Sequence, residues 1–260
     1  MNFDLVLAGV GGQGVLSIAW VLDQAAHAVG LRLKQSEVHG MAQRGGAVSA
    51  FVRLSDAPIA SDLVAAGTAS LIAAVEPLEA LRYTALLRAD GTLVTDVTPM
   101  VNIDNYPEPA ALYEVLFSAP NLVALDATRL AHAAGTVKAQ NTVVLGAAAP
   151  FLPIAFETIE AQLRALFEPK GDRIVQANLR ALRKGCAATG FVQALCAAGV
   201  PCARVARVSS RLAFAPHAVD AETVAAWVDR LSGPHGEATA AQVFAAPRLV
   251  PLDAVHAVTA

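Results

Sequence analysis

The chain of 260 residues is rich in apolar residues (55%), poor in charged ones (16%) and almost neutral, with 19 basic against 22 acidic side chains. A balanced charge without a Lys/Arg stripe, together with only 5% aromatic residues, argues against nucleic-acid binding. Glycine or proline interrupts the longest uncharged stretches and no basic segment precedes the first apolar run, so we expect a cytoplasmic protein without a membrane span.

The first predicted strand, Asp4–Ala8, runs directly into a glycine-rich turn. Apolar residues then recur at helical spacing and predict a helix over Val15–Val29. The turn fits the pattern G-x-G-x-x-G, whose glycines permit a tight turn, close approach of a phosphate and close helix–strand packing. Backbone amides at the start of a helix favour an anion; a turn that only permits packing is the alternative. The loop residues expected to bind a cofactor are Gly9, Gly11, Gly12, Gln13 and Gly14.

The second predicted strand, Leu31–Gln35, lacks the acidic residue that holds the ribose in NAD sites. It offers Arg32 and Lys34 instead. Plain NAD binding is therefore disfavoured, whereas a phosphorylated adenosine such as that of NADP or coenzyme A stays possible.

A polar, glycine-rich segment follows this strand and carries several side chains suited to chemistry. In a doubly wound sheet it lies at the same carboxyl edge as the glycine loop, so the two should converge. Arg44, followed by Gly45 and Gly46, suits a bidentate contact to phosphate or carboxylate. His39 either moves protons or orients the segment by hydrogen bonds. Glu37 is structural if it pairs with Arg44 and functional if it does not.

Further along the chain, alternating strands and helices predict a three-layer α/β/α, Rossmann-like fold with a mostly parallel sheet. We expect strands at Ala47–Leu54, Ser70–Val75, Thr92–Asp96 and Leu122–Asp126. Helices are expected at Pro77–Arg88, Pro109–Phe117, Thr128–Ala134, Asn141–Phe151, Glu157–Phe167 and Asp172–Ala198, the last with a break near Gly185 or Gly190. Asn141 is expected to cap its helix and to reach the cofactor loop.

The C-terminal part contains several prolines and one predicted helix, Ala221–Leu231. We expect a domain over 1–190 and an extension over 191–260, which either docks onto a partner or is loosely ordered. Cys186, Cys196 and Cys202 have spacings that fit neither a zinc site nor an iron–sulfur cluster, so we predict no metal site and interpret them as small buried apolar residues.

Two motifs together resemble a known family: Gly-x-Gly-Gly-Gln-Gly-Val from residue 9, and Ser-Glu-Val-His-Gly-Met-Ala-Gln-Arg-Gly-Gly from residue 36. They are similar to the gamma domain of 2-oxoacid:ferredoxin oxidoreductases, and most of all to the beta subunit of indolepyruvate oxidoreductase. The resemblance extends to about residue 190 and includes Ser61–Val64, Glu76–Arg82, Leu125–Thr128 and Asn141–Ala147.

This resemblance implies an accessory subunit that is inactive alone and binds coenzyme A. Thiamine diphosphate, magnesium and iron–sulfur clusters would belong to a catalytic partner subunit, which passes electrons to ferredoxin or another acceptor. The complex would convert an aryl pyruvate-like 2-oxoacid to an acyl-CoA, with the segment Glu37 to Gly46 as a lid over the thiamine site. The same family position makes Glu37 and His39 candidate catalytic residues.

Two other functions stay open at this point. The glycine loop with Arg32 and Lys34 would also suit an NADP-dependent reductase, although no catalytic constellation is recognisable. A purely structural assembly subunit is the second alternative.

Overall fold

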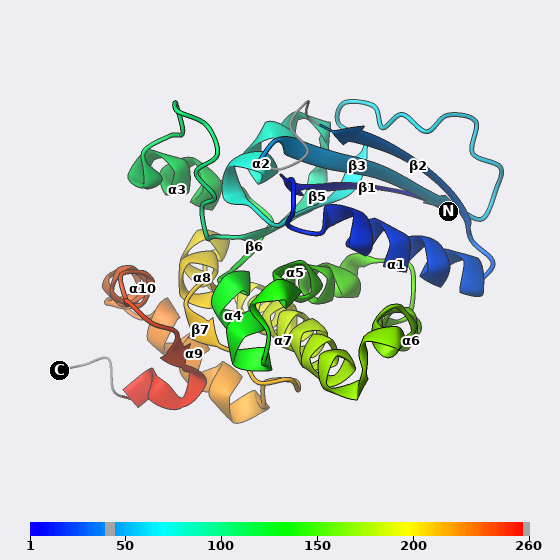
Figure 1. Cartoon of the computed structure of the whole chain (residues 1–260). Coiled ribbons are helices and arrows are strands. Elements are labelled where there is room, and N and C mark those ends of the chain that lie inside the picture. Colours follow the sequence, from blue (N-terminus) through cyan, green and yellow to red (C-terminus); the bar gives the residue numbers. More distant parts are fainter. Residues whose placement is uncertain (40–44, 257–260) are drawn as a thin grey trace.

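The computed structural model describes residues 1–39 and 45–256, and its centre is a mixed six-stranded sheet with the order β2-β3-β1-β4-β5-β6 (Figure 1). Four strands are mutually parallel, which confirms the mostly parallel α/β fold. The strands are β1 (Asn2–Val10), β2 (Arg32–His39), β3 (Ala47–Ser55), β4 (Ala69–Ala74), β5 (Leu87–Asp96) and β6 (Leu122–Leu125).

Helices cover both faces of the sheet, because the buried strands are apolar on both sides. Leu5 and Leu7 of β1 face one apolar core, and Val6 and Ala8 face the other. The first core is closed by α1 (Val15–Ala28), α4 (Ala127–Ala134), α5 (Gln140–Ala148), α6 (Phe156–Phe167) and α7 (Asp172–Ala197). The second is closed by α2 (Pro77–Arg82), α3 (Pro109–Phe117) and α8 (Cys202–Ser209).

The N-terminal side of the sheet departs from a doubly wound arrangement. β3 lies between β2 and β1 and is antiparallel to both. β2 also continues to His39, beyond the predicted end at Gln35, since its last residues pair with the beginning of β3. The predicted loop after the second strand is therefore the connection of a β-hairpin, and both ends of that connection lie at the carboxyl edge of β1.

α5 and α7 cross with their backbones in contact. A Cβ added at Gly146 would lie 1.8 Å from the carbonyl oxygen of Leu182, and one at Gly185 would lie 1.9 Å from that of Val143. Thr189 donates a buried hydrogen bond to the carbonyl of Ala147 (2.6 Å) on the same contact. The predicted break near Gly185 or Gly190 is wrong: α7 is continuous, and Gly185 serves close packing.

The C-terminal part packs on this framework. Besides the predicted helix, observed as α9 (Ala221–Ser232), it contains α8, β7 (Leu212–Ala213), α10 (Gly236–Phe244) and β8 (Val250–Pro251), which the sequence patterns did not reveal. Phe191, Phe214 and Trp227 form a buried aromatic cluster, so the described part of the extension is folded. Residue 190, the expected boundary, lies inside α7.

Two further sequence expectations are resolved by the fold. The three cysteines are half-buried rather than fully buried, and the thiols of Cys196 and Cys202 lie 2.7 Å apart where α7 turns into α8. Within the described ranges, no helix has the length and apolar run needed to cross a bilayer.

Candidate functional site

The glycine loop joins β1 to α1, as predicted. Gly14 is the N-cap of α1 in a left-handed conformation (φ 78°), and neither a capping side chain nor an acidic residue in the first turn occupies this helix end. Gly12 is exposed and has φ 102°, and among the described residues none apart from its chain neighbours would come within 4 Å of a Cβ placed on it. The loop therefore presents open backbone beside a helix N-terminus of positive potential.

The β2–β3 hairpin meets this loop, which confirms the expected convergence. The Gly11 N–H donates to the Gly46 carbonyl (2.8 Å), and the Gly45 N–H donates to the Gly11 carbonyl (3.4 Å). The side-chain amide of Asn102, from the segment after β5, donates to the Gly45 carbonyl (2.7 Å). Three segments far apart in the sequence thus share one edge of the sheet.

Two of the predicted ligand-binding residues have structural contacts. A Cβ at Gly9 would lie 2.5 Å from Val75, so this glycine permits close packing between β1 and the end of β4. The Gln13 side chain accepts a hydrogen bond from the Val10 N–H (2.7 Å) and donates one to the Val75 carbonyl (3.0 Å). Gln13 therefore fixes the shape of the loop.

Asn141 reaches the loop as expected, but it does not cap its helix. α5 begins at Gln140 and its N-cap is Ala139, so Asn141 already lies inside the first turn. Its side-chain amide donates to the Gly14 carbonyl (3.0 Å) and fills the space that a Gly14 side chain would need. α5 and the start of α1 are thereby joined directly.

The hairpin residues singled out from the sequence are only partly described. Glu37 is exposed, and its carboxylate accepts a hydrogen bond from the Gln35 amide (2.6 Å). Arg44 and the side chain of His39 lie outside the described residues. The alternatives for Glu37 and His39 therefore stay predictions.

Three acidic side chains, which we did not identify from the sequence, are buried at the same edge. Glu76 follows β4, Asp96 ends β5 and Asp126 follows β6, each at most 3% exposed. A shared sequence signal was available, since each directly follows or ends a predicted apolar strand. The carboxyl edge is therefore polar underneath the glycine loop.

Asp96 is the most deeply buried of these acids. Its carboxylate accepts hydrogen bonds from the N–H groups of Thr98 (3.0 Å) and Ala127 (3.1 Å), the Thr128 hydroxyl (3.1 Å) and the Gln140 amide (2.5 Å). Burial raises the pKa of Asp96 to about 6, although these donors favour the ionised form. Burial therefore favours the protonated form of this acid over a wider pH range than for an exposed carboxyl group.

Hydrogen bonds connect this acid to the glycine loop. Gln140 donates both to Asp96 and to the Val75 carbonyl (3.1 Å), which also accepts from Gln13. The Val75 carbonyl, just after β4, therefore joins the glycine loop to the start of α5 by accepting a hydrogen bond from each.

The other two acids hold neighbouring segments in place. Glu76 caps α2 through the Glu79 N–H (2.7 Å) and accepts a hydrogen bond from the Tyr106 hydroxyl. Asp126 caps α4 and forms an ion pair with Arg211 (3.2 Å), which comes from the C-terminal extension. The extension therefore reaches this edge of the sheet.

The basic residues that would suit NADP lie elsewhere. Arg32 is the first residue of β2. Lys34 pairs with Arg53 of β3, which in turn pairs with Asp4 near the start of β1, whereas the glycine loop follows the other end of β1. The intervening strand is about 20 Å long at roughly 3.3 Å per residue. Lys34 instead donates to the Ala60 carbonyl (3.1 Å). The support that Arg32 and Lys34 gave to NADP binding is thus removed.

The described residues contain no cluster of three or more His, Cys, Asp or Glu side chains arranged to hold a metal ion. The polar groups at the edge bond chiefly to backbone N–H groups and to one another. Chemically, this arrangement is suited to holding an anionic group by backbone amides of the glycine loop, while the hydrogen-bonded side chains of Gln13, Gln140 and Asn141 keep the loop rigid.

Comparison with known proteins places the chain in a family. Residues 4–188 match the pyruvate ferredoxin/flavodoxin oxidoreductase family. Indolepyruvate oxidoreductase subunit IorB of Archaeoglobus fulgidus is 34% identical over 194 residues, which are 71% of this chain and 94% of that protein. The protein of the same name from Methanothermobacter thermautotrophicus is 32% identical, over 71% of this chain and 96% of its own length.

Solved structures agree on the fold. A keto/oxoacid ferredoxin oxidoreductase gamma subunit from Geobacter sulfurreducens has a TM-score of 0.51 at 22% identity, over 70% of this chain and 95% of its own. A 2-oxoglutarate:ferredoxin oxidoreductase from Magnetococcus marinus, solved with 2-oxoglutarate, coenzyme A and succinyl-CoA bound, has a TM-score of 0.57 at 20% identity. The match covers 72% of this chain but only 31% of that one. The chain therefore belongs to the pyruvate ferredoxin/flavodoxin oxidoreductase family and is an accessory subunit of a 2-oxoacid:ferredoxin oxidoreductase.

Proposed function

We propose that this subunit binds the phosphate groups of coenzyme A at the glycine loop and contributes the coenzyme A side of the active site in a 2-oxoacid oxidoreductase. The main support for this proposal is the exposed backbone of Gly12 next to the N-terminus of α1, where no side chain caps the helix. Such a helix end attracts anions through its free N–H groups and its dipole.

The described residues fit a phosphate-bearing group. Among the described residues, none apart from the chain neighbours of Gly12 comes within 4 Å of a Cβ built on it, and no acidic side chain lies in the first turn of α1 to repel a phosphate. Gln13 and Asn141 hold the loop from below, so it is shaped before a ligand arrives. Bound coenzyme A would supply the thiol that accepts the acyl group. Arg44, at the neighbouring hairpin, is proposed to contact a second anionic group.

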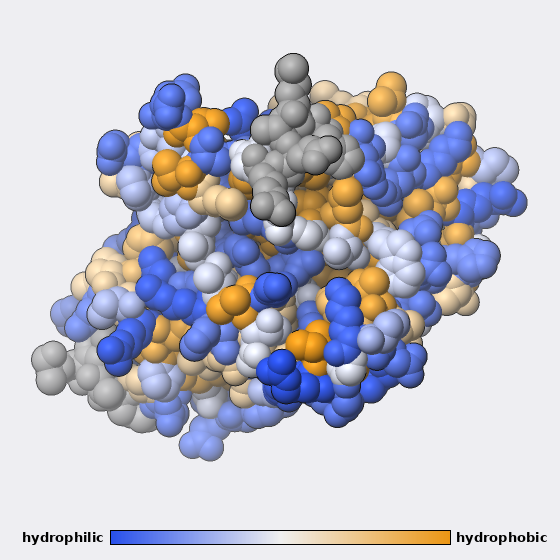
Figure 2. All heavy atoms as spheres, in the orientation of Figure 1, coloured by the Kyte–Doolittle hydropathy of each residue, from blue (hydrophilic) through white to orange (hydrophobic). Residues whose placement is uncertain are grey.

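A catalytic partner subunit is proposed to cover this edge. The large apolar side chains exposed in the described residues include several on segments that leave the carboxyl edge: Leu16, Val38, Met100, Val101 and Val137. Val101 is 73% exposed and Val137 58%. Figure 2 shows apolar and polar side chains interspersed on the face in view, as on an ordinary protein surface, so the exposed apolar side chains named above are what supports the interface. The hairpin connection would then act as the lid over the partner's thiamine site and exclude water.

The partner would carry thiamine diphosphate, magnesium and the iron–sulfur clusters, and ferredoxin or another acceptor would take the electrons. The names of the relatives at 32 to 34% identity support an aryl pyruvate as the 2-oxoacid. Docking of residues 191–260 onto the partner stays a prediction. In the described part of this extension no large apolar side chain is exposed, so its surface offers no apolar patch that would support docking.

The decisive experiment compares Gly12→Val with Gly30→Val in the assembled complex. Both glycines have positive φ (102° and 74°), and no described residue apart from their chain neighbours comes within 4 Å of a Cβ built on either, so valine strains the backbone at both positions. Only Gly12 lies in the loop, and its new side chain would block a phosphate. We expect Gly12→Val to assemble but to raise the KM for coenzyme A at least tenfold, whereas Gly30→Val should leave it unchanged.

The outcome separates this proposal from the structural alternative. If the folded, assembled Gly12→Val complex kept the normal dependence on coenzyme A, the loop would be a packing turn. The assembly-subunit function would then be favoured.

A further inference from the structure

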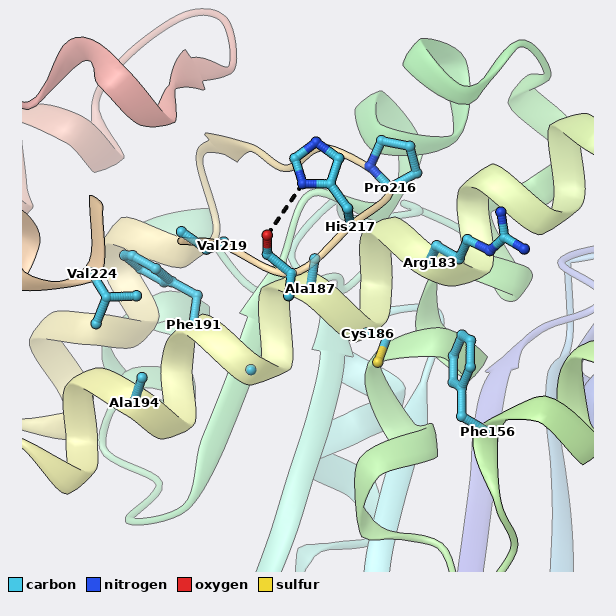
Figure 3. A pocket seen from close by; sticks show the side chains of 12 residues that line it. Phe156, Arg183, Cys186, Ala187, Phe191, Ala194, Pro216, His217, Val219 and Val224 are labelled. Atoms are coloured by element: carbon cyan, nitrogen blue, oxygen red, sulfur yellow. Dashed lines mark hydrogen bonds between the residues drawn. The ribbon is translucent and has the colours of Figure 1, made fainter. Parts of the chain in front are cut away.

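A pocket lies between α7 and the C-terminal extension, away from the glycine loop. It has a volume of about 420 Å³, within the range of small-molecule sites. Figure 3 shows Arg183 near one end of the pocket and Val224 at the other, with Phe191 and Cys186 of α7 between them. None of these residues belongs to the candidate site at the carboxyl edge.

One wall of the pocket belongs to the part of the chain outside the family match. Phe156, Arg183 and Cys186 come from α6 and α7, within the matched residues 4–188. Pro216 to Val219, with Val224 of α9, come from the extension. The pocket is therefore formed by an addition to the family domain.

Gly190 lines the pocket at an exposed position of α7. A Cβ at Gly190 would meet nothing within 4 Å, whereas one at Gly185 in the same helix would collide with α5. A glycine in a helix interior costs about 1 kcal/mol relative to alanine, and here no neighbouring backbone requires it. Its effect is to leave space in the pocket wall.

The lining points to a neutral aromatic ligand. Phe156, Phe191 and Val224 present apolar surface, and the burial of Cys186 raises the pKa of its thiol and keeps it uncharged. The charge of Arg183 is matched by Glu160, whose carboxylate accepts hydrogen bonds from its Nε (2.9 Å) and Nη2 (2.6 Å). A ligand carboxylate would have to compete with this bidentate pair.

We propose that the pocket between α7 and residues 216–224 binds a small neutral aromatic molecule, independently of the coenzyme A site. His217 borders the pocket at an exposed position, and its Nδ1 lies 3.2 Å from the Ala218 carbonyl (Figure 3). A ligand with an apolar ring and one N–H or hydroxyl group would match a mostly apolar lining with a polar border.

Isothermal titration calorimetry of the full chain with indole and with indole-3-acetate tests the proposal. Indole should bind with a Kd below about 1 mM and the acetate more weakly. Gly190→Leu fills the pocket and should weaken indole binding at least tenfold, with thermal stability equal to or above that of the unsubstituted chain. The control Ala197→Leu adds the same side chain at an exposed position of α7 and should leave the affinity unchanged.

Should Gly190→Leu fail to fold, Ala194→Phe narrows the same pocket from a half-buried position and is expected to weaken binding similarly. No measurable binding of indole, or unchanged affinity in the folded pocket-filling variants, would overturn the proposal. Tighter binding of indole-3-acetate that is lost in Arg183→Gln would overturn the neutral ligand class.

Discussion

The carboxyl edge of the sheet and the crossing of α5 with α7 both depend on glycine, but for opposite reasons. At the crossing, Gly146 and Gly185 bring two backbones into contact and leave no room for any side chain. At the edge, no described residue comes within 4 Å of a Cβ built at Gly12, apart from its chain neighbours, and its backbone is exposed. The two regions therefore use glycine differently: the crossing needs the missing side chain for backbone contact, whereas at Gly12 the exposed backbone is the proposed phosphate-binding surface.

The two regions also differ in polarity. The crossing buries apolar side chains and a few uncharged polar ones such as Thr189, whereas the edge buries the carboxyl groups of Glu76, Asp96 and Asp126 among hydrogen-bond donors. A close-packed crossing without buried titratable groups responds to changes in volume, and a buried network of carboxyl groups responds to pH. Three predictions test this contrast.

The largest effect is expected at the crossing. Gly185→Ala places a methyl group 1.9 Å from the Val143 carbonyl oxygen, so α7 must move away from α5. We expect a loss of at least about 3 kcal/mol in the free energy of unfolding. Urea denaturation followed by circular dichroism measures it. A loss below 1 kcal/mol would show that the helices separate easily and that this contact is not critical.

The second prediction concerns Asp96 at the edge. Its pKa in the folded chain, about 6, lies above the usual 3.8, so the folded state holds this proton more tightly than the unfolded state does. Stability from this group is therefore complete below pH 4 and falls as the pH rises through 6, by up to about 3 kcal/mol. Asp96→Asn should make the stability profile flatter between pH 4 and 6.

Unfolding free energies of both proteins across this pH range provide the measurement. Equal slopes for the unsubstituted chain and Asp96→Asn would mean that Asp96 does not titrate there. Thr128→Val, which removes one donor to the same carboxylate, is the companion variant and should raise the pKa of Asp96 further.

The smallest effect is expected at Gly190, on the same helix as Gly185. Gly190→Ala meets no neighbouring atom, so it should stabilise α7 by about 0.5–1 kcal/mol through its higher helix propensity. Thermal unfolding measures the shift. Destabilisation here would show that the difference between the two glycines does not arise from the space around them.

Local patterns predicted much of the glycine loop and its helix. The apolar strand, the G-x-G-x-x-G spacing and the helical periodicity after Val15 are all encoded within a short window, so the junction at Gly14 agrees with the sequence. The antiparallel insertion of β3 was not predictable, because pairing partners of strands depend on residues far apart in the chain.

The contacts of the site residues were also outside local information. Asn141 was expected as a cap because of its residue type, yet its amide bonds to Gly14, more than a hundred residues away. α10 was missed because its short, alanine-rich sequence has weak periodicity, and packing on α8 holds it in place. α8 has a clear apolar face, so a local signal for it was available; its eight residues pack on β6.

The sequence by itself determined the α/β class, the order of most elements and the family, because apolar periodicity and two adjacent motifs are local properties. Only the tertiary structure decided what each glycine does. Gly9, Gly12, Gly185 and Gly190 are the same residue type, and the atoms around each one determine whether it permits packing, exposes backbone or leaves a hollow. Those atoms come from β4, α5 and the C-terminal extension, and folding alone brings them together.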